Sequence, residues 1–386
     1  TKKSPVGAFA KFGKSKWLSF GGWINAIIPI LIVPYYSVIG GWVIKYLIEY
    51  FAGHSKTLAG DAYFTTFISN GWSTEICFII FTLFTLGIIY AGVRNGIERV
   101  SKFMMPILIV LSLIIAVYSV TRPGAIEGVK YFLVPNFDHF SWMTVVSAMG
   151  QMFYSLSIAM GILITFGSYM KKDTSIEKST ENVEIFDTAI AIMAGLMIIP
   201  AVFAFSGGNA ETLKSGPALM FITIPKVFAN MGFGTAIGIV FFLLVLFAAV
   251  TSSIALTESA VSTFEDELHW SRKKSTVFMG MVMLLLGTLS CLGYGPLANF
   301  KILGMQFLDF FDFITNSVMM PIAAIATCLL VSKVVGVDKI EEEIKKDGQA
   351  FRRKKIFCFM IKYLCPLFAA IILISSVANA FGIITM

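Results

Sequence analysis

Hydroxyl-bearing side chains gather in the middle of two long uncharged runs of the sequence. The first run, Phe140–Met170, contains Gln151-Met-Phe-Tyr-Ser-Leu-Ser157, and the second, Val227–Thr257, contains Ala248-Ala-Val-Thr251-Ser-Ser253. Oxygen atoms are the ligands that hard cations such as sodium prefer, as calcium and magnesium do. The alternative is that these hydroxyls only bond to helix carbonyls or join packed helices. On the residues alone, both interpretations stay open.

Four acidic residues lie at or near the ends of uncharged runs: Asp187, Glu258, Asp309 and Asp312. An ionised group at membrane depth is costly, so each such acid is a candidate functional residue. An acid at the end of a span can instead reach interfacial water, which weakens each case. Asp187 is the most interesting of the four because the residues after it are apolar.

No arrangement in the sequence suits covalent catalysis or a transition metal. The three His are scattered, and no His, Cys or Ser is spaced as a nucleophile with a paired base. The five Cys fall almost entirely inside apolar runs, which indicates small packing residues rather than a disulfide framework. An enzyme is therefore not predicted.

The composition is that of a membrane protein. The 386 residues are 57% hydrophobic and 14% charged, with a mean hydropathy of +0.81. A soluble protein carries about 25% charged residues, because its surface has to be solvated. A soluble enzyme, a disordered tail and a nucleic-acid-binding protein are thereby excluded.

Nine uncharged runs approach or exceed the roughly 20 residues that a helix needs to cross a bilayer. They are Trp17–Ile44, Ile76–Val93, Phe103–Thr121, Phe140–Met170, Thr188–Ala210, Val227–Thr257, Ser275–Phe300, Phe313–Ser332 and Tyr363–Met386. The two hydroxyl-bearing runs are too long for one straight crossing. A broken helix exposes free backbone amides and carbonyls, which transporters use to hold ligands at the membrane midplane.

The distribution of Lys and Arg gives the expected orientation. With nine spans, 22 Lys and Arg fall on the side of the N-terminus and seven on the other side. Because cytoplasmic loops are enriched in basic residues, the N-terminus is predicted to be cytoplasmic. The net charge of +7 is therefore a topology signal and not a nucleic-acid patch.

Two segments that connect expected spans can be interpreted from their composition. Residues 209–231 contain Gly216-Pro217 and Pro225, fall on the outer side, and are interpreted as a surface loop or an extracellular re-entrant loop. Residues 333–355 are basic and are interpreted as a solvated cytoplasmic loop with a helix.

Several strings, in order and with matching spacing across almost the whole chain, resemble the neurotransmitter:sodium symporter family, specifically its prokaryotic amino-acid branch. They are Pro34-Tyr-Tyr-Ser-Val-Ile-Gly-Gly-Trp42, Gly96-Ile-Glu-Arg99 with Met105-Pro106, Gly150-Gln-Met-Phe-Tyr-Ser-Leu-Ser157, Thr251-Ser-Ser-Ile-Ala255 with Phe264-Glu-Asp-Glu-Leu268, and Phe311-Asp-Phe313.

The resemblance implies an all-α membrane protein with the LeuT fold, an inverted-repeat helical bundle with broken first and sixth helices. The nine spans then correspond to family helices three to eleven, within one polytopic domain covering residues 1–386. The first two family helices have no counterpart in the sequence, so an N-terminally incomplete copy is expected.

The resemblance also implies the binding residues. Tyr36 matches the tyrosine that holds the substrate carboxylate, and Tyr154 is expected to close over the substrate as an aromatic lid. The substrate-binding positions are Ile32, Tyr36, Tyr154, Ser157, Met160, Ser252 and Leu256. The sodium positions are Ala248, Thr251 and Ser252 for the second site, and Ser155 for the first, with Asp187 at or next to a neighbouring position.

The acids take roles in ion coupling and gating under the same resemblance. Asp187 is expected to supply the negative charge that bound chloride supplies in relatives, so two sodium sites without a chloride requirement are predicted. Asp312 matches an outer-gate acid, and Asp266 an inner-gate acid with Tyr169 in its network. The resemblance places the basic partners of both acids in the absent first helix.

The predicted function is sodium-coupled symport of a neutral, hydrophobic or aromatic amino acid across the cytoplasmic membrane of a prokaryote. The alternative is a non-transporting membrane fragment or scaffold from a truncated or split gene, which the upstream reading frame would distinguish. An isolated chain of this length is expected not to bind its amino acid. Partners are the amino acid, sodium ions and the lipid bilayer, with no nucleic acid. The particular amino acid and the oligomeric state stay open.

Overall fold

A computed structural model describes the chain except for residues 14–15, 210–211, 214–215, 347–349 and 383–386. Parts of three expected features lie outside the described residues, namely parts of the 209–231 and 333–355 segments and the end of the last span. In the described part, the regular elements are all helices, with one isolated β-bridge between Ile302 and Met305.

Eight helical runs in the described part are long and apolar enough to cross a membrane. They are built from α2 (Lys16–Phe51), α5 (Gly71–Tyr90), η1 with α6 (Val93–Glu98 and Arg99–Val120), α10 (Ile176–Ser206), α12 (Gly234–Glu267), α13 (Arg272–Leu292), α14 to η6 (Phe307–Asp312, Phe313–Met319, Met320–Leu329 and Leu330–Val335), and α17 to α18 (Lys354–Phe359, Met360–Leu364 and Cys365–Ala380). The chain is therefore a multi-pass membrane protein.

The remaining expected span, Phe140–Met170, is a broken helix. Its halves are α8 (Trp142–Ser155) and α9 (Ile162–Tyr169), with a non-helical segment between them. Ser157, Ala159 and Gly161 in this segment have φ values of 52°, 60° and 72°. This left-handed conformation is unfavourable in a helix of L-residues, so the chain leaves the helical path here. By contrast, α12 (Gly234–Glu267) is continuous through residues 248–253, and the other overlong run, Val227–Thr257, is interrupted only near its start, at residues 230–233.

The helix α10 begins twelve residues before the start of the expected span Thr188–Ala210. The Ser175 side chain caps it by accepting a hydrogen bond from the Lys178 amide at 3.2 Å, and Glu177 in the first turn complements the helix dipole. Because the sequence-based boundary followed only the apolar run, it missed this polar first part. Asp187 consequently lies inside α10 rather than at the mouth of a span.

The helix α2 forms the centre of the bundle and contacts α1, α5, α12, α13 and α15. Its glycines permit close packing: a Cβ added to Gly41 would lie 2.6 Å from the Phe78 backbone nitrogen of α5. Farther along α2, the ring of Trp42 packs edge-on against Phe64 of α4 (Tyr63–Ser69) and Phe221 of η4 (Leu219–Thr223). The core thus surrounds the helix that carries Tyr36.

The described part of segment 209–231 packs into the bundle. It contains η4 and α11 (Ile224–Ala229), whose Phe221, Val227 and Phe228 are buried. The Tyr46 hydroxyl of α2 donates to the Phe221 carbonyl at 2.7 Å. These contacts favour the re-entrant interpretation over an exposed loop, and its extracellular placement stays a prediction.

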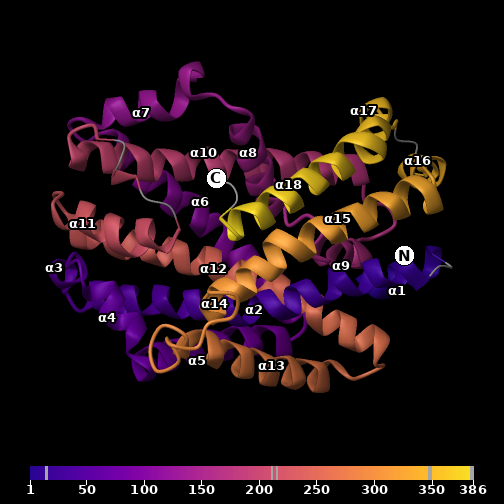
Figure 1. Cartoon of the computed structure of the whole chain (residues 1–386), viewed down its shortest axis with the longest axis horizontal. Helices are drawn as coiled ribbons and strands as arrows, with labels where there is room; N and C mark the ends of the chain where they lie inside the picture. Colours follow the sequence, from indigo (N-terminus) through magenta and orange to yellow (C-terminus); the bar gives the residue numbers. More distant parts are fainter. Residues whose placement is uncertain (14–15, 210–211, 214–215, 347–349, 383–386) are drawn as a thin grey trace.

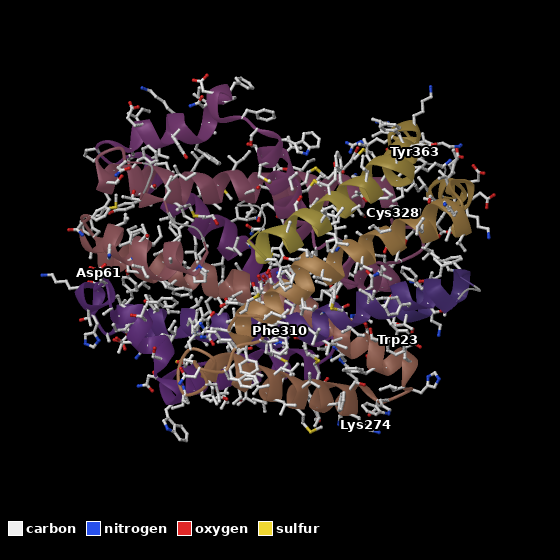
Figure 2. All side chains as sticks on the ribbon, in the orientation of Figure 1. Trp23, Asp61, Lys274, Phe310, Cys328 and Tyr363 are labelled. Carbon is white, nitrogen blue, oxygen red and sulfur yellow. The ribbon has the colours of Figure 1, made fainter. Side chains whose placement is uncertain are left out.

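The short helices mark the two ends of the bundle. Figure 1 shows α1 (Pro5–Phe12), α16 (Val337–Lys345) and α17 at one end, and α3 (Ser55–Leu58), α4 and α11 at the other. Figure 2 places Lys274 at the first end and Asp61 at the opposite one. The remaining described helices, α7 (Ala125–Leu133) and η2 (Phe137–His139), connect α6 to α8. The basic segments of the sequence therefore share one end, which we call the basic end.

Candidate binding site

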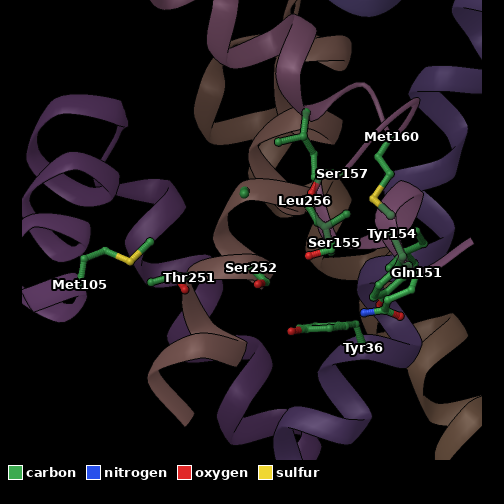
Figure 3. Close-up of a pocket in the computed structure, with 13 residues that line it drawn as sticks. Tyr36, Met105, Gln151, Tyr154, Ser155, Ser157, Met160, Thr251, Ser252 and Leu256 are labelled. Carbon is green, nitrogen blue, oxygen red and sulfur yellow. The ribbon is translucent and has the colours of Figure 1, made fainter. Parts of the chain in front are cut away.

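A cavity of about 470 Å³ lies where the break between α8 and α9 faces α2, α6 and α12. Figure 3 shows Tyr36 pointing into this space below Ser252, with Tyr154 and Gln151 beside it. The lining residues are Ile32, Tyr36, Met105, Gln151, Tyr154, Ser155, Ser157, Met160, Ile162, Thr251, Ser252, Ala255 and Leu256.

All seven residues expected around a substrate line this one cavity: Ile32, Tyr36, Tyr154, Ser157, Met160, Ser252 and Leu256. They come from three separate parts of the chain, which the fold brings together. Three of the expected sodium ligands line the same cavity: Ser155, Thr251 and Ser252, the last of which is also one of the seven. The lining includes no Asp, Glu, Lys, Arg or His, so its polar groups are hydroxyls and one amide.

The broken helix supplies the cavity with backbone groups as well as side chains. The last four carbonyls of a helix and the first four amides of the next lack partners within their helices. Amides of the break bind three of these α8 carbonyls, those of Met152, Phe153 and Tyr154, and the Thr165 amide binds the Gly161 carbonyl. The groups left for a ligand are therefore the Ser155 carbonyl and the first amides of α9, at residues 162–164. The site can therefore offer both backbone donors and backbone acceptors to a zwitterionic or charged ligand.

Asp187 lies behind the cavity wall rather than in it. The Ser155 hydroxyl donates to Asp187 Oδ1 at 2.6 Å, which joins the start of the break to α10. Ser155 lines the cavity and Asp187 is half-buried. A carboxylate and a hydroxyl oxygen are therefore held together at the cavity edge, a donor pair suited to a hard cation.

The hydroxyls of α12 divide between two faces. Thr251 Oγ1 donates to the carbonyls of Phe247 and Ala248, at 3.1 and 3.0 Å, so its lone pairs are left for another partner. Ser252 lies near the Tyr36 hydroxyl and interacts with it. Ser253 is turned away from the cavity, and it accepts a hydrogen bond from Thr85 of α5 at 3.2 Å. Only two of the three consecutive hydroxyls thus face the site, and Ala248 itself does not line the cavity.

Asp312, the last residue of α14, lies beside Tyr35 in the middle part of α2. It accepts hydrogen bonds from the Tyr35 hydroxyl at 3.2 Å and from Asn316 Nδ2 at 2.6 Å. Within the described chain it has no ion pair with a basic residue. Nearby, the Tyr294 hydroxyl donates to Asp309 at 2.9 Å. Burial, and then the Asp309 carboxylate, raise the pKa of the Tyr294 phenol, so it stays a donor.

Asp266 has partners that the resemblance did not anticipate. Lys3 Nζ lies 3.4 Å from its carboxylate, and the Ser4 amide donates to it at 2.7 Å. The N-terminal stretch therefore supplies the partner that was expected in an absent helix. Ser4 also caps α1 by accepting from the Gly7 amide. This contact places the start of α1 against the end of α12.

Tyr169 belongs to a different network from that of Asp266. Its hydroxyl donates to Glu258 at 2.6 Å, and the Arg272 guanidinium binds both oxygens of the same carboxylate. The Glu258 side chain is fully buried, and Arg272 also donates to the Ile89 carbonyl at 2.9 Å. A bidentate pair with further hydrogen bonds satisfies a buried acid that would otherwise be costly. The expected placement of Tyr169 beside Asp266 is therefore corrected to Glu258.

Four lining residues were not assigned from the sequence: Met105, Gln151, Ile162 and Ala255. Met105 and Gln151 lie inside the quoted strings, but nothing in one sequence shows which face they present. Ala255 follows Ser252 by three positions and Thr251 by four, so helical periodicity gave a usable signal for it. Among the described residues, no group of three or more His, Cys, Asp or Glu is placed to hold a metal ion.

A multi-pass helical protein with an uncharged cavity at a broken helix belongs to the class of secondary transporters. The sequence profile of the sodium:neurotransmitter symporter family matches residues 64–383. The chain belongs to this family, and it is a transporter rather than an enzyme.

Relatives and a solved structure agree with this assignment. The chain is 32% identical to the sodium-dependent transporter YhdH of Bacillus subtilis, over 96% of this chain and 81% of that protein. It is 30% identical to a sodium-dependent transporter of Haemophilus influenzae, over 94% and 80%. The crystal structure of MhsT in complex with L-phenylalanine matches with a TM-score of 0.84 and 32% identity, over 97% of this chain and 85% of that one. The expected LeuT fold is thereby confirmed.

Proposed function

We propose that the protein couples the entry of sodium ions to the uptake of a neutral, hydrophobic or aromatic amino acid by alternating access. The observation that carries this proposal is the convergence on one cavity of seven expected substrate residues and three expected sodium ligands, with Ser252 expected in both roles. The membrane is the cytoplasmic membrane of a prokaryote, with the N-terminus and the basic end in the cytoplasm, as the excess of Lys and Arg there supports.

The substrate class follows from the chemistry of the lining. Tyr36 and the helix break form a polar end that suits the carboxylate and ammonium groups of an amino acid. Ile32, Met160 and Leu256 offer apolar surface to its side chain, and the flexible thioether of Met160 adapts to different shapes. A charged side chain would find no counter-charge in the cavity lining. The volume falls within the range of about 300–1,000 Å³ typical of small-molecule sites.

The sodium ions are proposed to bind at two places along the cavity. The first site uses Ser155 with Asp187, and the second uses the Ala248 carbonyl with the Thr251 and Ser252 hydroxyls. The names of the sodium-dependent relatives support sodium as the ion. The Asp187 carboxylate supplies a fixed negative charge beside the first site, so chloride is not required.

Alternating access requires contacts that open at one end while others close at the opposite end. On the side of the basic end, Asp266 with Lys3, and Glu258 with Arg272 and Tyr169, are candidates for an inner gate. On the opposite side of the cavity, Asp312 with Tyr35 is the candidate outer gate. Tyr154, on the first half of the broken helix, is placed to act as the lid.

The test is uptake of radiolabelled neutral amino acids by membrane vesicles from cells that express the protein from its own gene. An inward sodium gradient should drive accumulation of one or more apolar amino acids, and replacing sodium by choline should abolish it. Lysine and glutamate serve as charged controls and should not accumulate. Absence of accumulation for all apolar amino acids would reject the proposal in favour of a non-transporting scaffold.

A further inference from the structure

A second hollow, of about 380 Å³, opens on the outer surface of the bundle between α5, α6 and α12. Seven of its eight lining side chains are apolar, and the eighth is Arg99. It backs on to the cavity of the binding site: Met104 and Val250 line the hollow, while their neighbours Met105 and Thr251 line the cavity. We call this second hollow the α5–α6–α12 groove.

The groove has an exposed apolar rim and a buried apolar floor. Phe84 and Phe103 on its rim are 55% and 66% exposed, whereas Met104 and Val250 on its floor are buried. A rim of this kind on a membrane-spanning bundle faces hydrocarbon, because exposing two aromatic rings to water is unfavourable. The groove is therefore open to the acyl chains of the bilayer.

Arg99 places a cation at one end of this apolar groove. It is exposed at the start of α6, and it makes no ion pair or hydrogen bond with the described part of the chain. The neighbouring acid, Glu98, is already bound to Lys102 at 2.6 Å. A guanidinium presents a planar fork of donors that matches a phosphate. The groove therefore combines an apolar surface with one cation at its end. This combination is complementary to an anion that is attached to an apolar chain.

The groove extends from the basic end into one leaflet of the bilayer. Arg272 binds both Glu258 of α12 and the Ile89 carbonyl near the end of α5. Glu258 therefore lies at the same depth in the membrane as the end of α5, at the basic end. Val250 precedes Glu258 by eight residues on the same helix, or roughly 12 Å toward the middle of the membrane. Since half the hydrocarbon core is about 15 Å thick, the groove follows an acyl chain down most of one leaflet.

We propose that the α5–α6–α12 groove binds an anionic glycerophospholipid of the leaflet at the basic end. Its phosphate accepts hydrogen bonds from Arg99, and one acyl chain lies along Phe103 and Leu246 over the buried floor. A zwitterionic lipid is disfavoured because its ammonium group would approach the Arg99 guanidinium and offset the attraction of its phosphate. Arg94, a second exposed cation without an ion pair in the described chain, does not line the groove. This site is separate from the amino-acid cavity and does not depend on the transport proposal.

Native mass spectrometry of the full chain, released from detergent micelles after titration with defined lipids, tests this inference. Dioleoyl phosphatidylglycerol should bind about tenfold more tightly than dioleoyl phosphatidylcholine, as expected for one charge-assisted contact. Dihexanoyl phosphatidylglycerol carries the same headgroup and should bind more weakly than the dioleoyl form, because it cannot fill the groove.

A matched pair of variants locates the site. Arg99→Gln should remove the preference for phosphatidylglycerol, whereas Arg94→Gln removes an equal charge from the same segment and should leave the preference within about twofold. Thermal unfolding without added lipid, unchanged in both variants, establishes that each is folded. Equal losses in the two variants, equal binding of the two dioleoyl lipids, or equal binding of the short-chain form would each overturn the proposal.

Discussion

Two adjacent tyrosines at the start of the quoted Pro34–Trp42 string have different tasks. Tyr36 points into the cavity near Ser252, whereas the Tyr35 hydroxyl donates to Asp312. Successive residues on a helix lie about 100° apart, so these neighbours on α2 face the cavity and Asp312, the acid of the proposed outer gate. Both residues are tyrosines, so their type does not show which one faces the cavity. Their positions around the helix do.

The first prediction concerns the carboxylate of the substrate. Tyr36→Phe should weaken equilibrium amino-acid binding by about 10- to 100-fold, because a hydrogen bond to a charged group is lost. Tyr35→Phe removes the same atom from the next residue and should change the affinity by less than about threefold. Radioligand binding at saturating sodium, with the protein expressed from its own gene, measures both. Equal losses in the two variants would contradict the assignment of Tyr36.

The second prediction concerns Asp187, whose carboxylate is held by Ser155 at 2.6 Å. Asp187→Asn should lower the sodium affinity by at least about tenfold, since a charge near a bound cation contributes several kcal/mol at low effective dielectric. Wild-type uptake should be unchanged when chloride is replaced by gluconate, and the variant should become stimulated by chloride. Asp173→Asn, an exposed change just before α10, is the control. Chloride-stimulated uptake by the wild type would refute the role given to Asp187.

The side chains that line the cavity could be predicted from the sequence to a large extent, because the resemblance to a known family assigned them position by position, and helical periodicity agrees with that assignment. Ser252 and Leu256, four positions apart, had to share a face of a helix, and both line the cavity. Contacts between distant segments were less accessible. Glu258 was assigned no partner, since its bonds to Tyr169 and Arg272 depend on how α9, α12 and α13 pack.

At the scale of elements, the broken helix organises the site. The segment between α8 and α9 directs Ser157 and Met160 into the cavity, while Gly161 packs at its far end. A Cβ on Gly161 would lie 2.7 Å from the Asn25 carbonyl of α2 and 3.1 Å from Ser259 Oγ of α12. The break is therefore held from both sides by long continuous helices.

The third prediction follows from this packing. Gly161→Ala should destabilise the protein by at least about 1–2 kcal/mol, because the residue has a φ of 72° and the added methyl meets backbone. Gly167 lies in α9 with no atom within 4 Å of an added Cβ, so Gly167→Ala should stabilise by up to about 1 kcal/mol. Thermal unfolding in detergent measures both changes, and a neutral Gly161→Ala would show that the break is not packed as described.

The boundaries of elements were predicted less well than their existence. The apolar run marked α10 from Thr188, but the capped polar part from Ile176 is helical too. It is held by ion pairs of Arg353 with Glu181 and Glu184, at 3.2 and 2.8 Å. Conversely, Val227–Thr257 was expected to be one overlong run, and the structure assigns residues 227–229 to α11 and residues 234–257 to α12. Hydropathy shows which residues can face lipid. It does not show where the hydrogen bonds of a helix begin.

At the scale of the molecule, the proposed inner and outer gates lie on opposite sides of the cavity. Asp312 lies toward the end with α3, α4 and α11, and Glu258 and Asp266 lie toward the basic end. The cavity is between them, beside the break. Such a placement of separate polar contacts on either side of one cavity is what alternating access needs.

The fourth prediction concerns orientation in the membrane. Cysteine placed at Lys56 of α3 should react with a membrane-impermeant maleimide in intact cells, and cysteine at Lys171 should react only after the cells are permeabilised. Both side chains are exposed, so access alone sets the difference. The wild type, whose five cysteines are buried or half-buried, gives the background. The reverse pattern would contradict a cytoplasmic basic end.

The central claim is that sodium and an amino acid bind to adjoining parts of one cavity and thereby stabilise each other. Reciprocal titration tests it most directly: the dissociation constant of the amino acid is measured as a function of sodium, and that of sodium as a function of the amino acid. Binding of each should tighten with the other by the same factor, since coupling free energies are reciprocal. Thr251→Ala should reduce that factor. An amino-acid dissociation constant that does not change between sodium-free and sodium-saturated solutions would contradict the account.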